Sequence, residues 1–154
     1  MAGDVLLTSG FITLLGGFPQ KYRNKCLQKW AKQLHDNGFD SGDEFVFAEL
    51  FGDSFKIRRW HQLGLPNDVM SINNALVIEK TKRFCLLLDI QMQGIQWLKA
   101  HCEEAGNLIL LKEQKNEGAK KKEESQFKKM VEIAIETGKT VIIEGVTDHI
   151  DLNL

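Results

Sequence analysis

Residues 85 to 100, CLLLDIQMQGIQWLKA, have the layout of a strand, a turn and a helix, and this layout constrains the fold most. The apolar run Cys85 to Leu88 has the length of a buried strand, and helical spacing of apolar residues begins at Ile95, after Gly94. Phosphate-binding loops share this layout and read G-x-x-x-x-G-K-[ST], because backbone amides and a lysine bind phosphate while the hydroxyl binds magnesium. The sequence therefore raises the question of a nucleotide site.

The loop keeps the frame of a phosphate-binding loop but lacks its chemistry. Asp89 replaces the first glycine, and its carboxylate would repel phosphates lying beside it. After Gly94, Ile95 replaces the lysine and Gln96 replaces the serine or threonine. These cofactor-binding positions are therefore predicted to be degenerate. Even a residual adenine pocket near residues 65–66 would lack phosphate contacts.

A second altered half-site lies at the end of the apolar strand pattern TVIIEGV. Glu144 ends this pattern, where nucleotide hydrolases place a metal-binding aspartate. Gly145 follows, where a glutamate would polarise the attacking water. Glu144 and Gly145 are therefore predicted to be degenerate Walker B-like positions, with no catalytic residue and no metal site. Two altered half-sites at matching places indicate a nucleotide-hydrolase core whose chemistry has been removed.

The remaining pattern predicts helices in the first part of the chain and an α/β arrangement in the second. A mostly apolar pattern with little polar face predicts a short buried helix over 4–15, and apolar residues at spacings of three and four predict an amphipathic helix over 20–35. Asp53-Ser54 is a typical cap for a helix over 55–62. Strands that alternate with helices form parallel sheets through right-handed crossovers, so the fold class is α/β with a partial parallel sheet, β-α-β-α-β. The predicted strands are Ala75 to Ile78, Phe84 to Leu88, Leu108 to Leu111 and Thr140 to Ile143, and the helices of this part are 93–104 and 122–137.

The composition is typical of one soluble globular domain. The 154 residues are 43% hydrophobic and 27% charged, with a net charge of -1, so no nucleic-acid partner is expected. Three cysteines without a CxxC spacing argue against a disulfide framework or a zinc cluster. No apolar stretch approaches the roughly 20 residues that cross a bilayer, and the N-terminus lacks the positive region of a signal peptide.

Several segments together resemble the fifth AAA+ module of dynein heavy chains, and the match covers nearly the whole chain. They include LLTSGFITLLGGF, FKIRRWHQLGLPNDVMSINNALVI, RFCLLLDIQMQGIQWLK and TVIIEGVTDHID. The loop segment is among the most specific, because it keeps the family's Asp89 and Trp97, although Ile90 replaces the family's proline. The residues around GLP resemble axonemal more than cytoplasmic heavy chains.

The resemblance implies that residues 1–154 are a partial AAA+ module of P-loop type, with a helical N-terminal part over 1–66 and a truncated α/β core over 67–154. It implies a ring of six modules that converts ATP hydrolysis into movement along microtubules, in which ATP and magnesium bind at other modules. The fifth module then has a mechanical role and no cofactor. Its implied partners are neighbouring modules, the linker and the strut of the stalk, and its implied location is the cytoskeleton, in a ciliary or flagellar axoneme.

An AAA+ sheet has the strand order five, one, four, three, two, so a fourth strand that this chain does not contain should separate Phe84–Leu88 from Thr140–Ile143. Two alternatives remain open. Either these two strands pair directly, or the place stays open and exposes apolar side chains. Those side chains would be Leu86, Leu88, Val141 and Ile142.

Two other functions compete with the ring module. One is a small nucleotide-binding α/β enzyme with a diverged loop, which requires a lysine near the loop. The nearest candidate, Lys99, lies about one turn too far along the helix. The other is a free-standing protein-interaction domain. Trp60 and Trp97 are assigned to packing.

Overall fold

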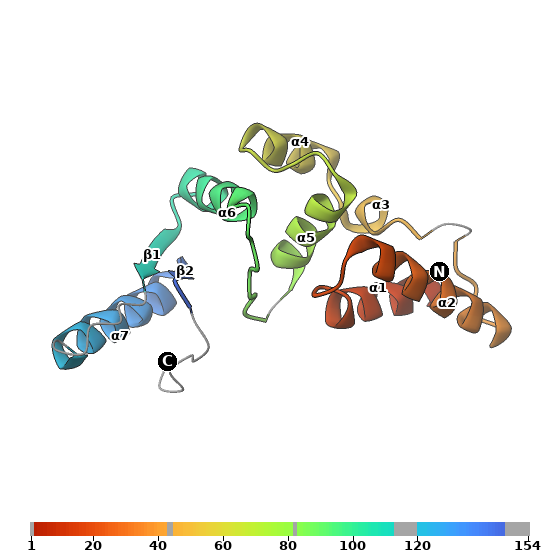
Figure 1. Cartoon of the computed structure of the whole chain (residues 1–154), viewed down its shortest axis with the longest axis horizontal. Helices are drawn as coiled ribbons and strands as arrows, with labels where there is room; N and C mark the ends of the chain where they lie inside the picture. Colours follow the sequence, from red (N-terminus) through yellow and green to blue (C-terminus); the bar gives the residue numbers. More distant parts are fainter. Residues whose placement is uncertain (1, 43–44, 82, 113–119, 147–154) are drawn as a thin grey trace. The chain divides into compact units, whose positions relative to one another are not determined.

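The computed structural model describes residues 2–42, 45–81, 83–112 and 120–146, with side chains from residue 126 onward in the last range. The chain divides into two compact units, Met1–Trp97 and Leu98–Leu154. Figure 1 shows the order of the elements. The described helices and strands are α1 Ala2–Leu14, α2 Gln20–Asp36, α3 Phe47–Phe51, α4 Ser54–Gln62, α5 Val69–Lys80, α6 Gln93–Glu104, β1 Leu108–Lys112, α7 Lys120–Thr137 and β2 Thr140–Glu144.

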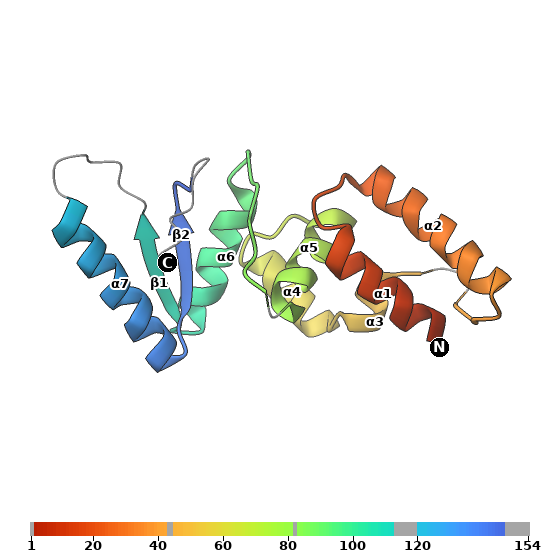
Figure 2. The same ribbon diagram turned by 90° about the horizontal axis from the view of Figure 1, so that it is seen from below.

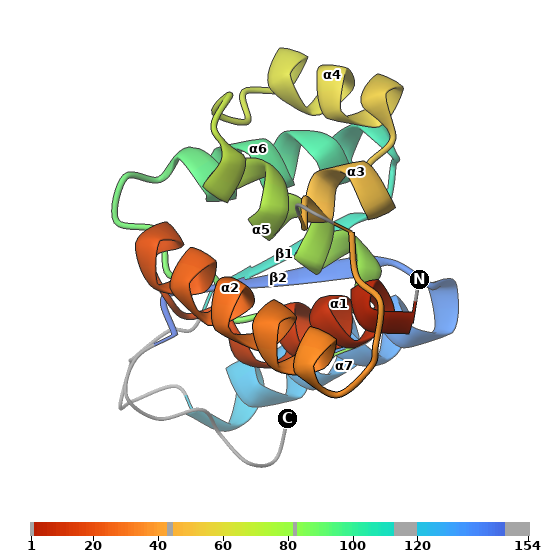
Figure 3. The same ribbon diagram turned by 90° about the vertical axis from the view of Figure 1, so that its right-hand side faces the viewer.

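Helices α1 and α2 lie side by side in the first unit, as Figure 3 shows, and confirm the two predicted N-terminal helices. They approach closely at Gly10, where an added Cβ would lie 2.9 Å from the Trp30 ring. The fully buried Arg23 closes the turn between them, because its guanidinium donates to the carbonyls of Gly16 at 2.8 Å and Phe18 at 2.7 Å. Burial lowers the pKa of Arg23. The sequence reading missed this buried cation.

Aspartates cap the N-termini of α4 and α5 in the rest of the first unit, whereas α3 follows Val46 without a side-chain cap. Asp53 accepts a hydrogen bond from the Phe55 amide at 2.8 Å, which confirms the predicted cap of α4. Asp68 accepts from the Ser71 amide at 2.9 Å and caps α5. These local bonds explain why α4 and α5 begin where they do.

The second unit contains a parallel pair of strands, and Figure 2 shows α7 alongside both. Their register pairs Leu108 with Thr140 and Lys112 with Glu144. The core between α7 and the strands contains Ile109, Leu111 and Ala134, with Phe127, Val131, Val141 and Ile143 packed against it. The predicted strands at Leu108–Leu111 and Thr140–Ile143 are thus confirmed, as is the helix between them.

Two predicted strands are wrong. Ala75 to Ile78 lies within α5, where Ala75 is buried among helices, because four apolar residues alone do not distinguish a strand from a buried helix. Phe84 to Leu88 belongs to no strand of the described residues. A strand needs a neighbour to satisfy its amides and carbonyls, and none of the described strands pairs with this segment. The described sheet is therefore β-α-β, made of β1, α7 and β2.

The side chains named for the open place differ in exposure. Leu86 and Leu88 are 71% and 82% exposed. In the second unit Val141 is half-buried and Ile142 is buried, so these two are not the exposed side chains that an open place would leave.

Candidate nucleotide site

The predicted loop brings Asp89 against the first turn of α6. Oδ2 of Asp89 accepts a hydrogen bond from the Ile95 amide at 2.9 Å. A Cβ added at Gly94 would lie 3.2 Å from the same oxygen, so the glycine allows the carboxylate to approach closely. Helix N-termini attract anions because their first amides lack carbonyl partners within the helix. Here the anion is a side chain of the protein itself.

This arrangement differs from a phosphate-binding loop in two ways: the loop carries a negative charge at Asp89, and a backbone amide at the start of α6 already has an acceptor. A bound phosphate needs free amides at the start of the helix, and the Ile95 amide already donates to Asp89. Ile95 is half-buried and Gln96 is exposed, and neither side chain carries a cation or a hydroxyl. The first turn of α6 therefore uses the Ile95 amide to bind Asp89, and the predicted degeneracy of Asp89, Gly94, Ile95 and Gln96 stays a prediction.

The turn before α6 contains Met92 in a left-handed conformation, with φ of 61°. Among the described residues no other non-glycine residue has a positive φ. Such a conformation costs an L-residue about 1–2 kcal/mol. Two hydrogen bonds hold this turn. The Gln96 amide donates to the Met92 carbonyl at 3.3 Å, and the Ile95 amide donates to the Asp89 carboxylate. No signal in the sequence marks Met92 for this role.

An open hollow of about 430 Å³ lies beside the loop. It brings the predicted adenine region near residues 65–66 together with the loop, because its lining includes Leu65, Pro66, Asp68, Asp89, Gly94 and Trp97. The lining contributed by the described residues contains two aspartates and neither lysine nor arginine. The negative charge of this lining disfavours a phosphate-bearing ligand.

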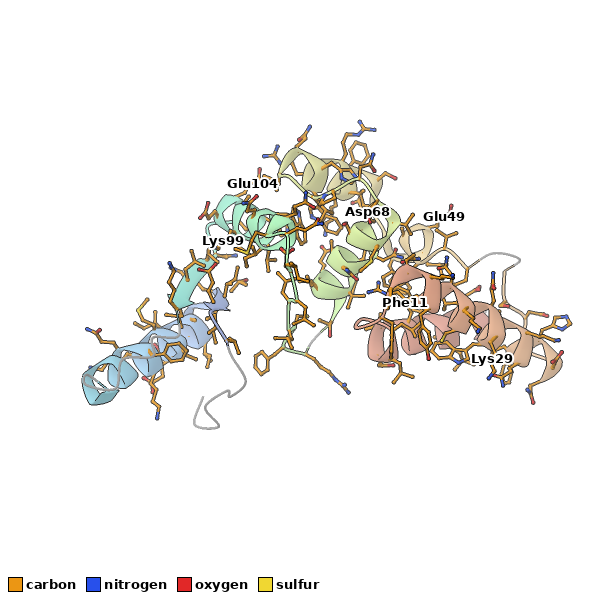
Figure 4. The ribbon with its side chains drawn as sticks, in the orientation of Figure 1. Phe11, Lys29, Glu49, Asp68, Lys99 and Glu104 are labelled. Atoms are coloured by element: carbon orange, nitrogen blue, oxygen red, sulfur yellow. The ribbon has the colours of Figure 1, made fainter. Side chains whose placement is uncertain are left out.

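Asp68, labelled in Figure 4, contributes part of that negative charge. Burial by itself raises the pKa of Asp68. Hydrogen bonds from the Ser71 hydroxyl and amide have the opposite effect and outweigh it, so the pKa lies below its ordinary value. The carboxyl is therefore ionised at neutral pH. Its two bonds from Ser71, at 2.6 and 2.9 Å, hold it at the start of α5.

Trp97 anchors the first turns of α6 within the first unit. Its ring meets that of Trp60 edge to face, with centroids 5.5 Å apart and planes at 74°. Both side chains are buried, which confirms their assignment to packing. Helix α6 thus has two contacts near its N-terminus: its Ile95 amide binds Asp89, and its Trp97 ring packs against Trp60 of α4.

The other half-site lies in the second unit, at the end of β2. Glu144 forms an ion pair with Lys99 of α6, which Figure 4 labels. The hydrogen bond from Lys99 lowers the pKa of Glu144, so the carboxylate is ionised. Its negative charge is balanced by the ammonium group of Lys99. Gly145 has φ of 79°, a conformation that disfavours the glutamate found there in hydrolases. Sequence reasoning considered Lys99 only as a phosphate ligand and missed its carboxylate partner.

The two half-sites belong to separate compact units. Within the described ranges, no group of three or more histidine, cysteine, aspartate or glutamate side chains could hold a metal ion. Within the same ranges, no helix combines the length and apolarity needed to cross a membrane.

Comparison with known proteins identifies the family. Residues 58–154 match the family described as the ATP-binding dynein motor region. This chain belongs to the dynein family. Over its full length the dynein chain is 31% identical to human dynein axonemal heavy chain 3, of which it covers 4%. Human dynein axonemal heavy chain 17 is 32% identical over 98% of the chain, which covers 3% of that protein.

A further relative is mouse dynein axonemal heavy chain 3, which is 30% identical over 98% of the chain. The dynein chain spans only 4% of the length of this relative. The family model and these three relatives confirm the predicted resemblance to dynein heavy chains. They also agree with the prediction that the resemblance is to the axonemal type.

Proposed function

We propose that this chain is part of the fifth AAA+ module of a dynein motor, and that the module acts mechanically without binding or hydrolysing ATP. The observation that carries the proposal is the 2.9 Å hydrogen bond from the Ile95 amide to Asp89. An internal carboxylate occupies the position that a phosphate would need. A nucleotide could bind only by displacing it, and would then place its phosphates beside a negative charge.

The second half-site supports the same conclusion. Magnesium in a nucleotide hydrolase needs an acidic residue that is free to bind it. Glu144 is paired with Lys99, so this carboxylate is committed to an ion pair. The pairing also removes Lys99 as the loop lysine that the diverged-enzyme hypothesis requires. The family description mentions ATP binding, and we assign that property to other modules of the parent protein, together with magnesium.

The mechanical role follows from the proposed place of the module in the ring. The chain would contact neighbouring AAA+ modules, the linker and the strut of the stalk, and would act on microtubules only through the parent protein. Its location would be the cytoskeleton, in an axoneme. In the complete module, Phe84 to Leu88 would become a strand of the β-α-β-α-β core once a neighbouring strand satisfies its backbone. Its exposed apolar side chains support this assignment.

Isothermal titration calorimetry tests the absence of nucleotide binding. ATP and ADP, each with and without magnesium, are titrated into the full chain after circular dichroism has shown that it is folded. We expect no heat of binding and, in a separate assay, no phosphate release. Magnesium-dependent binding at micromolar strength, about 8 kcal/mol, would overturn the proposal.

Sequencing the complete transcript separates the ring module from a free-standing interaction domain. The proposal requires a reading frame of several thousand codons with intact phosphate-binding loops upstream. A short transcript that encodes only this chain would favour the interaction domain.

A further inference from the structure

The outward face of α2 carries a stripe of lysines. These side chains, which we call the lysine stripe, are exposed and follow one another at spacings of four, four and three residues. With 3.6 residues per turn they fall within an arc of about 80° and along about 16 Å of the helix. Figure 4 labels Lys29 on α2. The stripe consists of Lys21, Lys25, Lys29 and Lys32.

The lysine stripe is not balanced by its own helix. Residues 19–35 contain no aspartate or glutamate, and the acidic residue of α2 is Asp36, at its last position. Among the described residues, none of the four lysines is seen in an ion pair. Like charges four residues apart destabilise a helix, and Lys21 lies in the first turn, where the helix dipole is positive.

A surface selected only for solubility would interleave acidic residues at these spacings, since oppositely charged neighbours stabilise a helix. Local rules that a chain breaks without internal compensation point to a functional surface. The lysine stripe breaks two such rules in one helix. An anionic partner along the same line would relieve both the mutual repulsion and the unfavourable dipole term.

An exposed aromatic pair marks one end of the lysine stripe. Phe18 and Tyr22 are 43% and 47% exposed, and their ring centroids lie 4.6 Å apart. On the helical wheel Tyr22 lies about 20° from Lys29, so the pair belongs to the same face. Exposed aromatic residues are frequent anchors of protein interfaces. The face therefore combines an apolar end with a cationic line.

We propose that this face binds an acidic α-helix of a protein partner. The partner would present carboxylates every three or four residues along the lysine stripe and an apolar side chain to Phe18 and Tyr22. A straight line of charges on one helix matches a second helix laid beside it, because both repeat at the same spacing. The inference is independent of the nucleotide proposal, since α2 contributes no residue to the hollow.

Other anionic partners fit the face less well. The whole chain has a net charge of -1, which disfavours a nucleic acid. The apolar exposure of the face is confined to one end, whereas a helix lying on a membrane needs an apolar stripe along its length.

Fluorescence anisotropy with a labelled helical peptide tests the proposal on the full chain. The probe is an alanine-based peptide of about 18 residues with glutamates at spacings of four, four and three and a leucine near one end. We expect saturable binding that weakens with added salt. Replacing the lysine stripe (K21Q, K25Q, K29Q, K32Q) should weaken binding about tenfold or more, since each exposed pair contributes modestly.

A matched control removes the same charge elsewhere. The control variant carries K80Q, K128Q, K129Q and K139Q, all at exposed positions, and should change the affinity by less than about twofold. Circular dichroism of both variants checks that α2 remains helical. Tyr22→Ala should weaken binding about threefold by removing the apolar anchor.

Three results would overturn the inference. The first is an equal loss of affinity in the control variant, which would show that bulk charge alone attracts the peptide. The second is equal binding of a peptide whose glutamates are contiguous, which would show that spacing has no role. The third is tighter binding of an RNA duplex or of vesicles rich in phosphatidylserine than of the helical peptide.

Discussion

Truncating Trp97 tests whether the start of α6 is held by packing. Its side chain is 3% exposed and that of Trp60 is 1% exposed, so Trp97→Ala removes a buried ring and leaves a cavity. Such truncations cost about 3–5 kcal/mol. Each kcal/mol lowers the melting temperature of a domain of this size by about 2–4 °C, so the variant should melt at least about 6 °C below the parent.

The energy of the ring pair can be separated from the cost of the cavity. The edge-to-face contact at 5.5 Å should contribute about 0.5–1.5 kcal/mol beyond area burial. Urea unfolding of Trp60→Ala, Trp97→Ala and the double variant, followed by far-ultraviolet circular dichroism, measures this coupling energy. Trp97→Phe should cost clearly less and remains measurable if the alanine variant does not fold.

The control is Phe55→Ala, because Phe55 is 81% exposed. This change should alter the free energy of unfolding by no more than about 0.5 kcal/mol. A Trp97→Ala protein that melts within about a degree of the parent would refute the core assignment. A zero coupling energy would refute the ring contact alone.

Three further predictions follow from the half-sites and the unpaired segment. Asp89→Ala leaves the Ile95 amide without its acceptor and should cost about 1 kcal/mol in urea unfolding; a variant as stable as the parent would show that the bond is unimportant. Lys99 lowers the pKa of Glu144, so the ionised Glu144 stabilises the folded chain. This contribution is complete at a pH above 4.5, the ordinary pKa of the group, and is lost as the pH falls through the lowered pKa of the folded state. Urea midpoints measured down to about pH 3 should fall less steeply in Lys99→Met than in the parent, and equal slopes would contradict the linkage. Finally, the exposed apolar segment Phe84–Leu88 should make the isolated chain self-associate at high concentration. The molar mass measured by light scattering after size exclusion should then exceed the 17.5 kDa of one chain, whereas a clean monomer would count against edge pairing.

The helices were the most predictable part of the fold, because their signals are local. Apolar spacing and the Asp53 cap placed α4 within one residue of its observed start, and the helix over 93–104 was predicted with its observed bounds. The predicted chemistry of the loop was equally local. The missing lysine, the missing hydroxyl and the extra carboxylate at Asp89 are visible in sixteen consecutive residues.

Partners distant in the sequence were not predictable in the same way. The ion pair between Lys99 and Glu144 joins residues on different elements, and no spacing rule connects them. Local spacing does not distinguish Arg23 from the lysines of its helix, yet Arg23 is buried against the turn before α2. Only the packed structure shows which charged groups are enclosed, because burial depends on elements that meet in space.

The sequence by itself determined the α/β class, the bounds of α6, the family and the residue types present in the loop, since each depends on residue types at short spacing. Tertiary structure decided where strands exist. Phe84–Leu88 and Leu108–Leu111 are both apolar runs of strand length, but only the second has a parallel partner, in β2. Backbone amides become part of a sheet when a neighbouring strand accepts their hydrogen bonds, and that neighbour is supplied by the fold and not by the run itself.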